Sequence, residues 1–156
     1  MIEVDNKKVL NLFANLSSKK QTKVYKQALT KATNILVKET RNELKKGVKN
    51  INTVHTSSSG KYSLSRGIQR KVWKNGEGAT VTILGDYRLK FFENGTKIRK
   101  TRKGYNRGTI KAQHFFDRAK QNKAKDIQKQ LNDLITNSIN KIAKKWLKLV
   151  KQYTNY

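Results

Sequence analysis

Apolar residues recur at helical spacing in two long segments, one near each end of the chain. Between Lys19 and Lys46 the series falls at intervals of one and three residues, and Gly47 stands where a helix would end: Tyr25, Ala28, Leu29, Ala32, Ile35 and Leu36. From 117 to 152 the same period continues: Ile127, Leu131, Leu134, Ile135, Ile142, Trp146 and Val150. The pattern predicts two long amphipathic helices, with a shorter helix over 6–16 before the first.

The pattern changes between these helical segments, where β-branched and aromatic residues alternate with polar ones. The turn sequence Asn75-Gly-Glu-Gly separates two short runs, which predicts a hairpin of 67–73 with 79–84. Tyr87, Leu89 and Phe91 alternate with basic residues and predict a third strand.

Two further segments complete the predicted organisation. A short fourth strand is expected at 109–112, and the Ser-rich segment 52–63 has the composition of a mobile loop. We therefore expect a single α+β domain over 1–156, with an antiparallel sheet of three to four strands packed against the two long helices. Its parts would be a helical region (1–50), a mobile loop (51–66), a sheet region (67–116) and a final helix (117–152).

The net charge changes what this domain is expected to bind. The chain of 156 residues has 36 Lys and Arg against 10 Asp and Glu, a formal charge of +26. So basic a surface indicates polyanionic partners: nucleic acid, an anionic membrane or acidic protein surfaces. Cysteine is absent, which excludes disulfides and thiolate metal sites. We find no segment with the apolar length of a signal peptide or a membrane span, so we expect a soluble protein. Neither long helix pairs a basic face with a strong exposed face of Trp or Phe, so we expect no membrane binding.

The positive charge is densest in segment 97–111, which we call the basic arm. No acidic residue occurs from Thr96 through Phe116. Tyr105 lies among the charges, and Gly104 and Gly108 loosen the backbone, as in segments that wrap an anion. The arm has seven basic residues, which we take as the candidate contacts to an acidic partner or DNA: Lys97, Arg99, Lys100, Arg102, Lys103, Arg107 and Lys111.

Residues with catalytic or metal-binding potential are few. His55 and His114 are the two histidines, and no carboxylate stands at a ligand-like spacing from either, so we predict neither a metal site nor a cofactor. Two alternatives to a structural protein stay open. One is a free nucleic-acid-binding protein, which the charge would explain directly. The other is a metal-free ribonuclease using His55, Tyr105, Arg102 or His114.

Two short motifs resemble those of a known family. The first is a Glu-x-Gly-Thr turn and the second is an aromatic element that runs into the last helix; their residues are Glu93, Gly95, Thr96, Ala112, Phe115, Phe116, Arg118 and Ala119. With the order of elements over nearly the whole chain, they resemble the tail-component family of tailed bacteriophages, the small neck and tail-completion proteins that join head to tail. The proline usual before the Phe is His114 here, and Gly60 stands four residues ahead of Leu64.

The resemblance implies a structural virion protein of the neck or tail, made in the host cytoplasm, and not an enzyme. It implies a sixfold or twelvefold ring of identical subunits, with portal or adaptor proteins and tail proteins as neighbours and DNA in the central channel. The matched motif residues would then have structural roles.

The charge of such a ring bears on what the arm contacts. A duplex segment about 34 Å long carries on the order of 20 phosphates, whereas six arms of seven charges each would bring 42 (6 × 7) positive charges. We therefore expect most arms to face acidic neighbouring proteins, with a minority of basic residues lining the channel.

Overall fold

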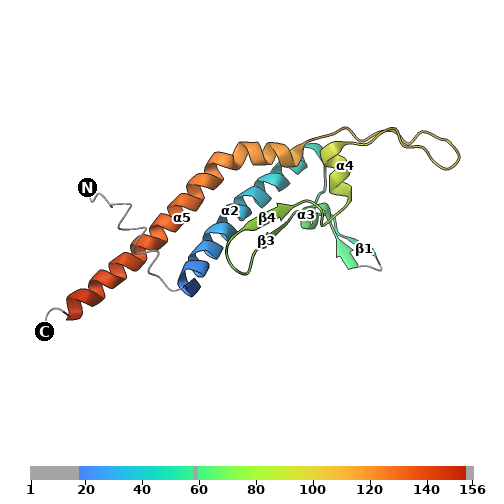
Figure 1. Cartoon of the computed structure of the whole chain (residues 1–156). Helices are drawn as coiled ribbons and strands as arrows, with labels where there is room; N and C mark the ends of the chain where they lie inside the picture. The colour runs from blue at the N-terminus through green and yellow to red at the C-terminus, as the bar shows by residue number, and fades with distance from the viewer. Residues whose placement is uncertain (1–17, 58–59, 154–156) are drawn as a thin grey trace.

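Two long helices form the frame of the molecule. The structure is a computed structural model that describes residues 18–57 and 60–153. Helix α2 (Ser18–Gly47) and helix α5 (Phe115–Tyr153) lie side by side and share the most extensive contact in the fold (Figure 1). Both long helices predicted from the sequence are confirmed, and α5 begins at Phe115, two residues before the expected start. The short helix predicted for 6–16 lies outside the described residues.

The buried face of α2 agrees with the predicted stripe at Ala28 and Ala32 and differs from it at other positions. Tyr25 is 38% exposed, whereas the preceding Val24 is buried. The buried face also includes two polar side chains, Thr40 and Glu43. The apolar residues of this face are Val24, Ala28, Ala32, Val37 and Leu44.

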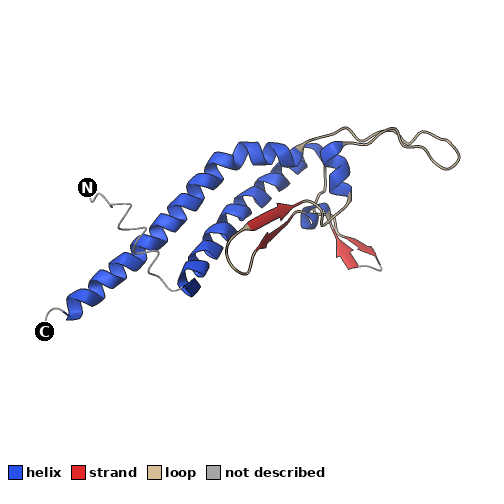
Figure 2. Cartoon of the chain, in the orientation of Figure 1, coloured by secondary structure: helices blue, strands red, loops and turns tan. Residues whose placement is uncertain are grey.

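The strands form two separate sheets. Strand β1 (His55–Ser57) pairs antiparallel with β2 (Gly60–Tyr62), and β3 (Gln69–Val72) pairs antiparallel with β4 (Ala79–Thr82) (Figure 2). The α+β class is confirmed, and so is the hairpin predicted around the Asn75 turn. The described residues contain two sheets of two strands each, in place of the single sheet of three to four strands that the pattern predicted.

The described flanks of the Ser-rich segment form two short paired strands. They pair in register, with His55 opposite Tyr62, and the two rings stack with centroids 5.7 Å apart. Because this aromatic pair holds the ends of the segment together, a small hairpin forms where composition alone predicted a mobile loop.

The predicted third strand is wrong, since residues Arg88–Asn94 form helix α4. Leu89 is fully buried, and a side chain built on Gly67 would approach its Cδ1 to 2.8 Å. Tyr87 and Phe91 pack edge to face, 5.9 Å apart, which suits residues four apart on a helix. Close packing of Leu89 on the glycine at the end of α3 (Leu64–Gly67) therefore outweighs the strand-like alternation.

The predicted fourth strand is also absent. Residues 109–112 have irregular backbone, and only Ile110 pairs across to Thr96. The C=O of Ile110 accepts from the N–H of Thr96 at 2.9 Å, but its own N–H donates to the Thr96 side-chain hydroxyl. A side-chain oxygen takes the place of the backbone acceptor, so the ladder does not continue.

The main core lies where α2, the β3–β4 hairpin, α4 and the start of α5 converge. Its buried members are Val37, Leu44, Ile51, Ile68, Ile83, Leu89 and Phe115. A smaller cluster of Val24 and Ile139 joins the two long helices farther along. The main core therefore sits directly beneath the segment from which the basic arm departs.

Candidate interaction site: the basic arm and its base

The two family-like motifs come together at the base of the arm. Glu93, the buried acid near the end of α4, accepts hydrogen bonds from the backbone N–H groups of Phe116 (2.8 Å) and Asp117 (3.2 Å). These are first-turn amides of α5, which have no partner inside the helix, and a carboxylate there also complements the helix dipole. The role of Glu93 is thus to cap the last long helix.

Gly95 and Thr96 close the base on the opposite side. Gly95 has φ +74°, and a Cβ at this position would lie 2.9 Å from both the Ala112 nitrogen and the Ile110 oxygen. Those neighbours are backbone atoms, which cannot yield as a flexible side chain would. Glycine is therefore required here by both conformation and space, and the first residues of the arm can pass close to its last.

The return of the arm is bonded to the end of α4. The N–H groups of Gln113 and His114 donate to the carbonyls of Phe92 (2.8 Å) and Glu93 (3.1 Å). These carbonyls lie in the last turn of α4, so no N–H group of the helix donates to them. Phe115, fully buried in the main core, then fixes the start of α5.

Arg118 links this base to α2. Its Nε donates to the Glu43 carboxylate at 2.9 Å, and Lys46 donates to the other oxygen of the same carboxylate at 2.5 Å. The hydrogen bond from Lys46, followed by that from Arg118, lowers the pKa of Glu43. Ala119 is fully buried beside this contact region of α5. All eight motif residues therefore lie at or next to the arm base.

The basic arm itself projects away from the body of the molecule (Figure 1). It folds back as an irregular hairpin, with backbone hydrogen bonds between Arg99 and Gly108 and between Arg107 and Arg99. A tight turn at its tip is closed by Thr101 and Tyr105. All seven basic residues named above are exposed, and Ile98 and Tyr105 are 62% and 70% exposed.

The charges of the arm have no counterpart within the described parts of the chain. The ion pairs seen there involve Lys46, Arg88, Arg118, Lys120 and Lys123, none of which belongs to the arm. Every described acidic residue except Glu39 and Asp133 already accepts a hydrogen bond or forms an ion pair inside the molecule. The arm is therefore available to an external anionic surface.

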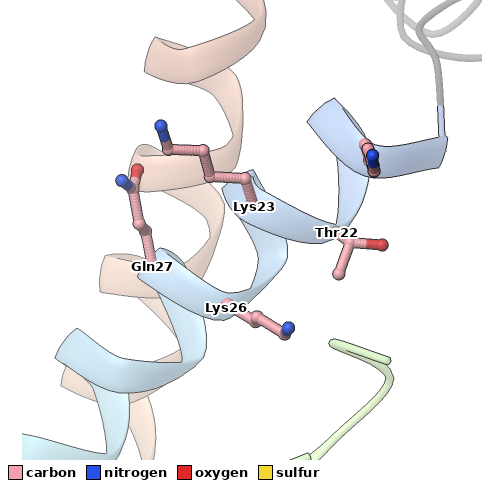
Figure 3. Close-up of a pocket in the computed structure, with 5 residues that line it drawn as sticks. Thr22, Lys23, Lys26 and Gln27 are labelled. Carbon is pink, nitrogen blue, oxygen red and sulfur yellow. The ribbon is translucent and has the colours of Figure 1, made fainter. Parts of the chain in front are cut away.

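A second basic surface lies on the first turns of α2. An open hollow of about 450 Å³ is lined by Lys19, Thr22, Lys23, Lys26 and Gln27. Lys23 and Lys26 point away from each other there (Figure 3). Their ammonium groups do not converge on one small anion, so this surface is better suited to diffuse electrostatic attraction than to a defined binding site.

One group of potential metal ligands also lies at the arm base. Ligand atoms of Glu93, His114 and Asp117 fall within 4.8 Å of one another. The sequence did not predict this proximity. Both Glu93 oxygens, however, already accept backbone N–H groups, and Asp117 pairs with Lys120 at 2.6 Å. The two carboxylates are thus engaged in helix capping and ion pairing, and we assign no metal to this group.

The residues considered for a ribonuclease are distributed over three elements. His55 belongs to β1, where it stacks on Tyr62; Arg102 and Tyr105 are near the tip of the arm; His114 is at its base. General acid–base catalysis requires its groups within hydrogen-bond reach of one scissile bond. No hydrogen bond joins any two of these residues in the described structure.

Glu43 and Asp86 are buried carboxylates whose ion pairs were not predicted from the sequence. Asp86 is buried and receives a bidentate contact from Arg88, with the shorter bond at 2.6 Å, and this hydrogen bonding lowers the pKa of Asp86. Glu43 had a recognisable signal: it falls at the helical period of the apolar stripe of α2. An acid at such a position predicts a buried ion pair.

Comparisons of the chain with models of known protein families, with curated proteins and with solved structures found no match. Among residues 18–57 and 60–153, no helix has the length and apolar character needed to cross a membrane.

Proposed function

We propose that this protein is a structural subunit at the head-to-tail junction of a tailed bacteriophage, where it forms a ring and binds acidic neighbouring proteins through the basic arm. The observation that carries this proposal is the arm: an exposed, projecting segment whose seven positive charges form no ion pair with the residues that the structure describes. A segment of this shape reaches beyond its own subunit.

The construction of the base supports a mechanical role. Glu93 caps α5, Gly95 allows a close backbone approach, and Phe115 packs in the main core. The residues of the two motifs therefore stabilise the base of the arm. A rigid base fixes the direction in which the arm leaves the domain, and pre-organisation of this kind lowers the entropic cost of binding a neighbour.

The distribution of acids supports a partner other than a second copy for the arm. Since nearly all described carboxylates are occupied within the chain, a second copy offers the arm few acidic contacts. An acidic protein surface, or DNA for a minority of the charges, supplies them. Complementary charge of this kind mainly steers and orients the partner.

The proposal is tested by quantitative mass spectrometry of purified, nuclease-treated virus particles from the source, scaled to the portal protein. A fixed ratio of about one half or one copy per portal subunit is expected for a neck or tail ring of sixfold or twelvefold symmetry. Absence of the chain from particles, with the protein left on nucleic acid in the lysate, would overturn the proposal in favour of a free nucleic-acid-binding protein.

A further inference from the structure

The β3–β4 hairpin has two open edges, and only one of them is protected. The edge of β3 carries Arg70 and Lys71, and the Arg41 side chain reaches across to the carbonyl of Ile68 at 3.4 Å. Charged residues and covering side chains are the usual means by which proteins prevent edge pairing. The edge of β4 has neither.

The outward-facing backbone groups of β4 follow from the hydrogen bonds that flank the ladder. Trp73 N–H donates to Gly78 C=O at 2.9 Å, and Gly85 N–H donates to Gly67 C=O at 3.1 Å. Because bonded and non-bonded pairs alternate along an antiparallel ladder, Thr80 and Thr82 bond to β3. The N–H and C=O groups of Ala79, Val81 and Ile83 therefore point away from β3, and no hydrogen bond to them occurs in the described structure outside the strand pairing.

The surroundings of β4 are exceptional for so basic a chain. Residues 75–87 contain no Lys or Arg, although the chain has 36 of them. The two most exposed large hydrophobic side chains in the described residues lie between the end of β4 and the start of α4: Leu84 at 73% and Tyr87 at 72%. A strand edge without charged side chains, next to exposed apolar groups, favours pairing with a strand of another chain.

We propose that a second copy of this chain covers this edge, with the two β4 strands paired antiparallel about a twofold axis. Two copies of charge +26 repel each other least where basic side chains are missing, and the segment that contains β4 has none. An acidic partner would be drawn instead to the basic surfaces. The inference concerns the free protein and does not rest on the proposed function.

The twofold axis sets the register. Val81 of one chain lies opposite Val81 of the other, and Ala79 lies opposite Ile83. In each of these pairs the outward-facing N–H and C=O groups of one residue bond to those of the other. Two hairpins joined in this way form one four-stranded sheet, which is more stable than an isolated two-stranded hairpin.

The same register places apolar groups together on the outer face. Leu84 falls opposite Gly78 of the second copy. A Cβ on Gly78 would lie 3.0 Å from the Trp73 ring, which shows that the ring packs directly over Gly78. Trp73 is 45% exposed, and the exposed Leu84 of the other copy would pack against it.

The association is measured by sedimentation equilibrium on nuclease-treated protein. We expect a dimer of twice the 18.0 kDa chain. Raising salt from about 0.1 M to about 1 M shortens the screening length from about 10 Å to about 3 Å, so dimerisation should strengthen with salt. A monomer at all concentrations and salt levels would overturn the inference, as would a dimer that dissociates when salt is added.

A matched pair of charge variants locates the interface. Thr80→Lys puts a charge on the exposed face of the β4 edge strand and should raise the dimer dissociation constant about tenfold or more. Gln69→Lys adds the same charge on the same sheet face, but on β3, and should leave dimerisation within about twofold of the parent. Equal effects of the two substitutions would contradict pairing at β4.

Cysteine cross-linking tests the register, since the chain has no cysteine of its own. Thr80 of one copy lies opposite Thr82 of the other, in a non-hydrogen-bonded pair about 4.5 Å apart at Cα. Mixed Thr80→Cys and Thr82→Cys proteins should therefore form an interchain disulfide, and each variant alone should form far less. Cross-linking of each variant alone at the level of the mixture would exclude this register.

Discussion

The carboxylate of Glu93 accepts a 2.8 Å hydrogen bond from the backbone N–H of Phe116, which joins the end of α4 to the start of α5. Between these two residues the chain leaves the domain, forms the whole basic arm and returns. The cap therefore holds both ends of the arm at a single place, next to the buried Phe115. This geometry couples the stability of α5 to the direction of the arm.

Removing the cap should destabilise the domain. Glu93→Ala leaves the N–H groups of Phe116 and Asp117 without their acceptor. Loss of an N-terminal helix cap costs about 0.5–2 kcal/mol, and we expect a cost toward the upper end because Glu93 is only 6% exposed. Thermal unfolding followed by circular dichroism measures the loss. Glu93→Gln keeps one acceptor oxygen and should fall between the parent and Glu93→Ala; an unchanged midpoint for Glu93→Ala would refute the capping role.

The conformation of Gly95 predicts a larger effect at the same site. Its φ of 74° and ψ of −176° lie in a region open essentially to glycine alone, and strain of this type costs about 1–3 kcal/mol. Gly95→Ala adds a clash with the backbone at Ile110 and Ala112. We expect a loss of about 2–4 kcal/mol in the free energy of unfolding, measured by urea denaturation.

Gly104 provides the control for that substitution. It also has positive φ, +84°, but a Cβ there meets no atom within 4 Å. Gly104→Ala should therefore show only the conformational penalty, about 1 kcal/mol, and confined to the arm tip it should barely change global unfolding. Equal losses for the two variants would show that close approach at the base is unimportant.

The sequence predicted the long helices well and the middle of the chain poorly, for identifiable reasons. Thirty or more residues of helical periodicity average out local exceptions, so α2 and α5 were found despite the shift from Tyr25 to Val24. The segment around Leu89 forms a helix of only 7 residues, which is too short for helical periodicity to outweigh local exceptions. Tyr87, Leu89 and Phe91 satisfy a strand pattern, while Tyr87 and Phe91 also satisfy the spacing of helical neighbours.

The candidate site divides in the same way. The arm and its seven charges could be found from composition. That Glu93 caps α5, or that Arg118 reaches Glu43, could not be found, because each contact joins residues far apart in the chain. Such contacts depend on how α2, α4 and α5 pack, which local periodicity does not specify.

Acid should weaken the contact between α2 and α5 through Glu43. Its hydrogen bonds from Lys46 and then Arg118 hold its pKa below the usual range of a glutamate. A group with a lowered folded pKa stabilises the fold above its unfolded pKa, and this contribution is lost as the pH falls through the folded value. The free energy of unfolding should therefore decline below about pH 4.5, where protonation becomes linked to unfolding.

Glu43→Gln tests this assignment directly. It should cost about 1–2 kcal/mol at neutral pH, because Arg118 and Lys46 are partly solvated, and it should flatten the decline below pH 4.5. Glu39→Gln, one turn earlier on α2 and without an ion pair in the described structure, serves as control and should preserve the parent slope. If Glu43→Gln keeps the full acid dependence, other carboxylates carry it.

Under the proposed function, neutralising the arm should block particle assembly without unfolding the protein. Arg99, Lys100, Arg102 and Lys103 are exposed and form no ion pair in the described structure, so their joint replacement by Gln should change the unfolding midpoint little. Complementation of a phage lacking the gene should then fail, with heads and tails left unjoined in electron micrographs.

A charge-matched control separates the arm from the general positive charge. Replacing Lys19, Lys20, Lys23 and Lys31 by Gln removes the same four charges from exposed positions on α2. If binding is specific to the arm, this variant should assemble particles, because diffuse attraction falls only modestly when four of 36 basic residues are lost. Normal assembly by the arm variant, with DNA release alone slowed, would place the arm on DNA. Equal failure of both variants would assign assembly to net charge.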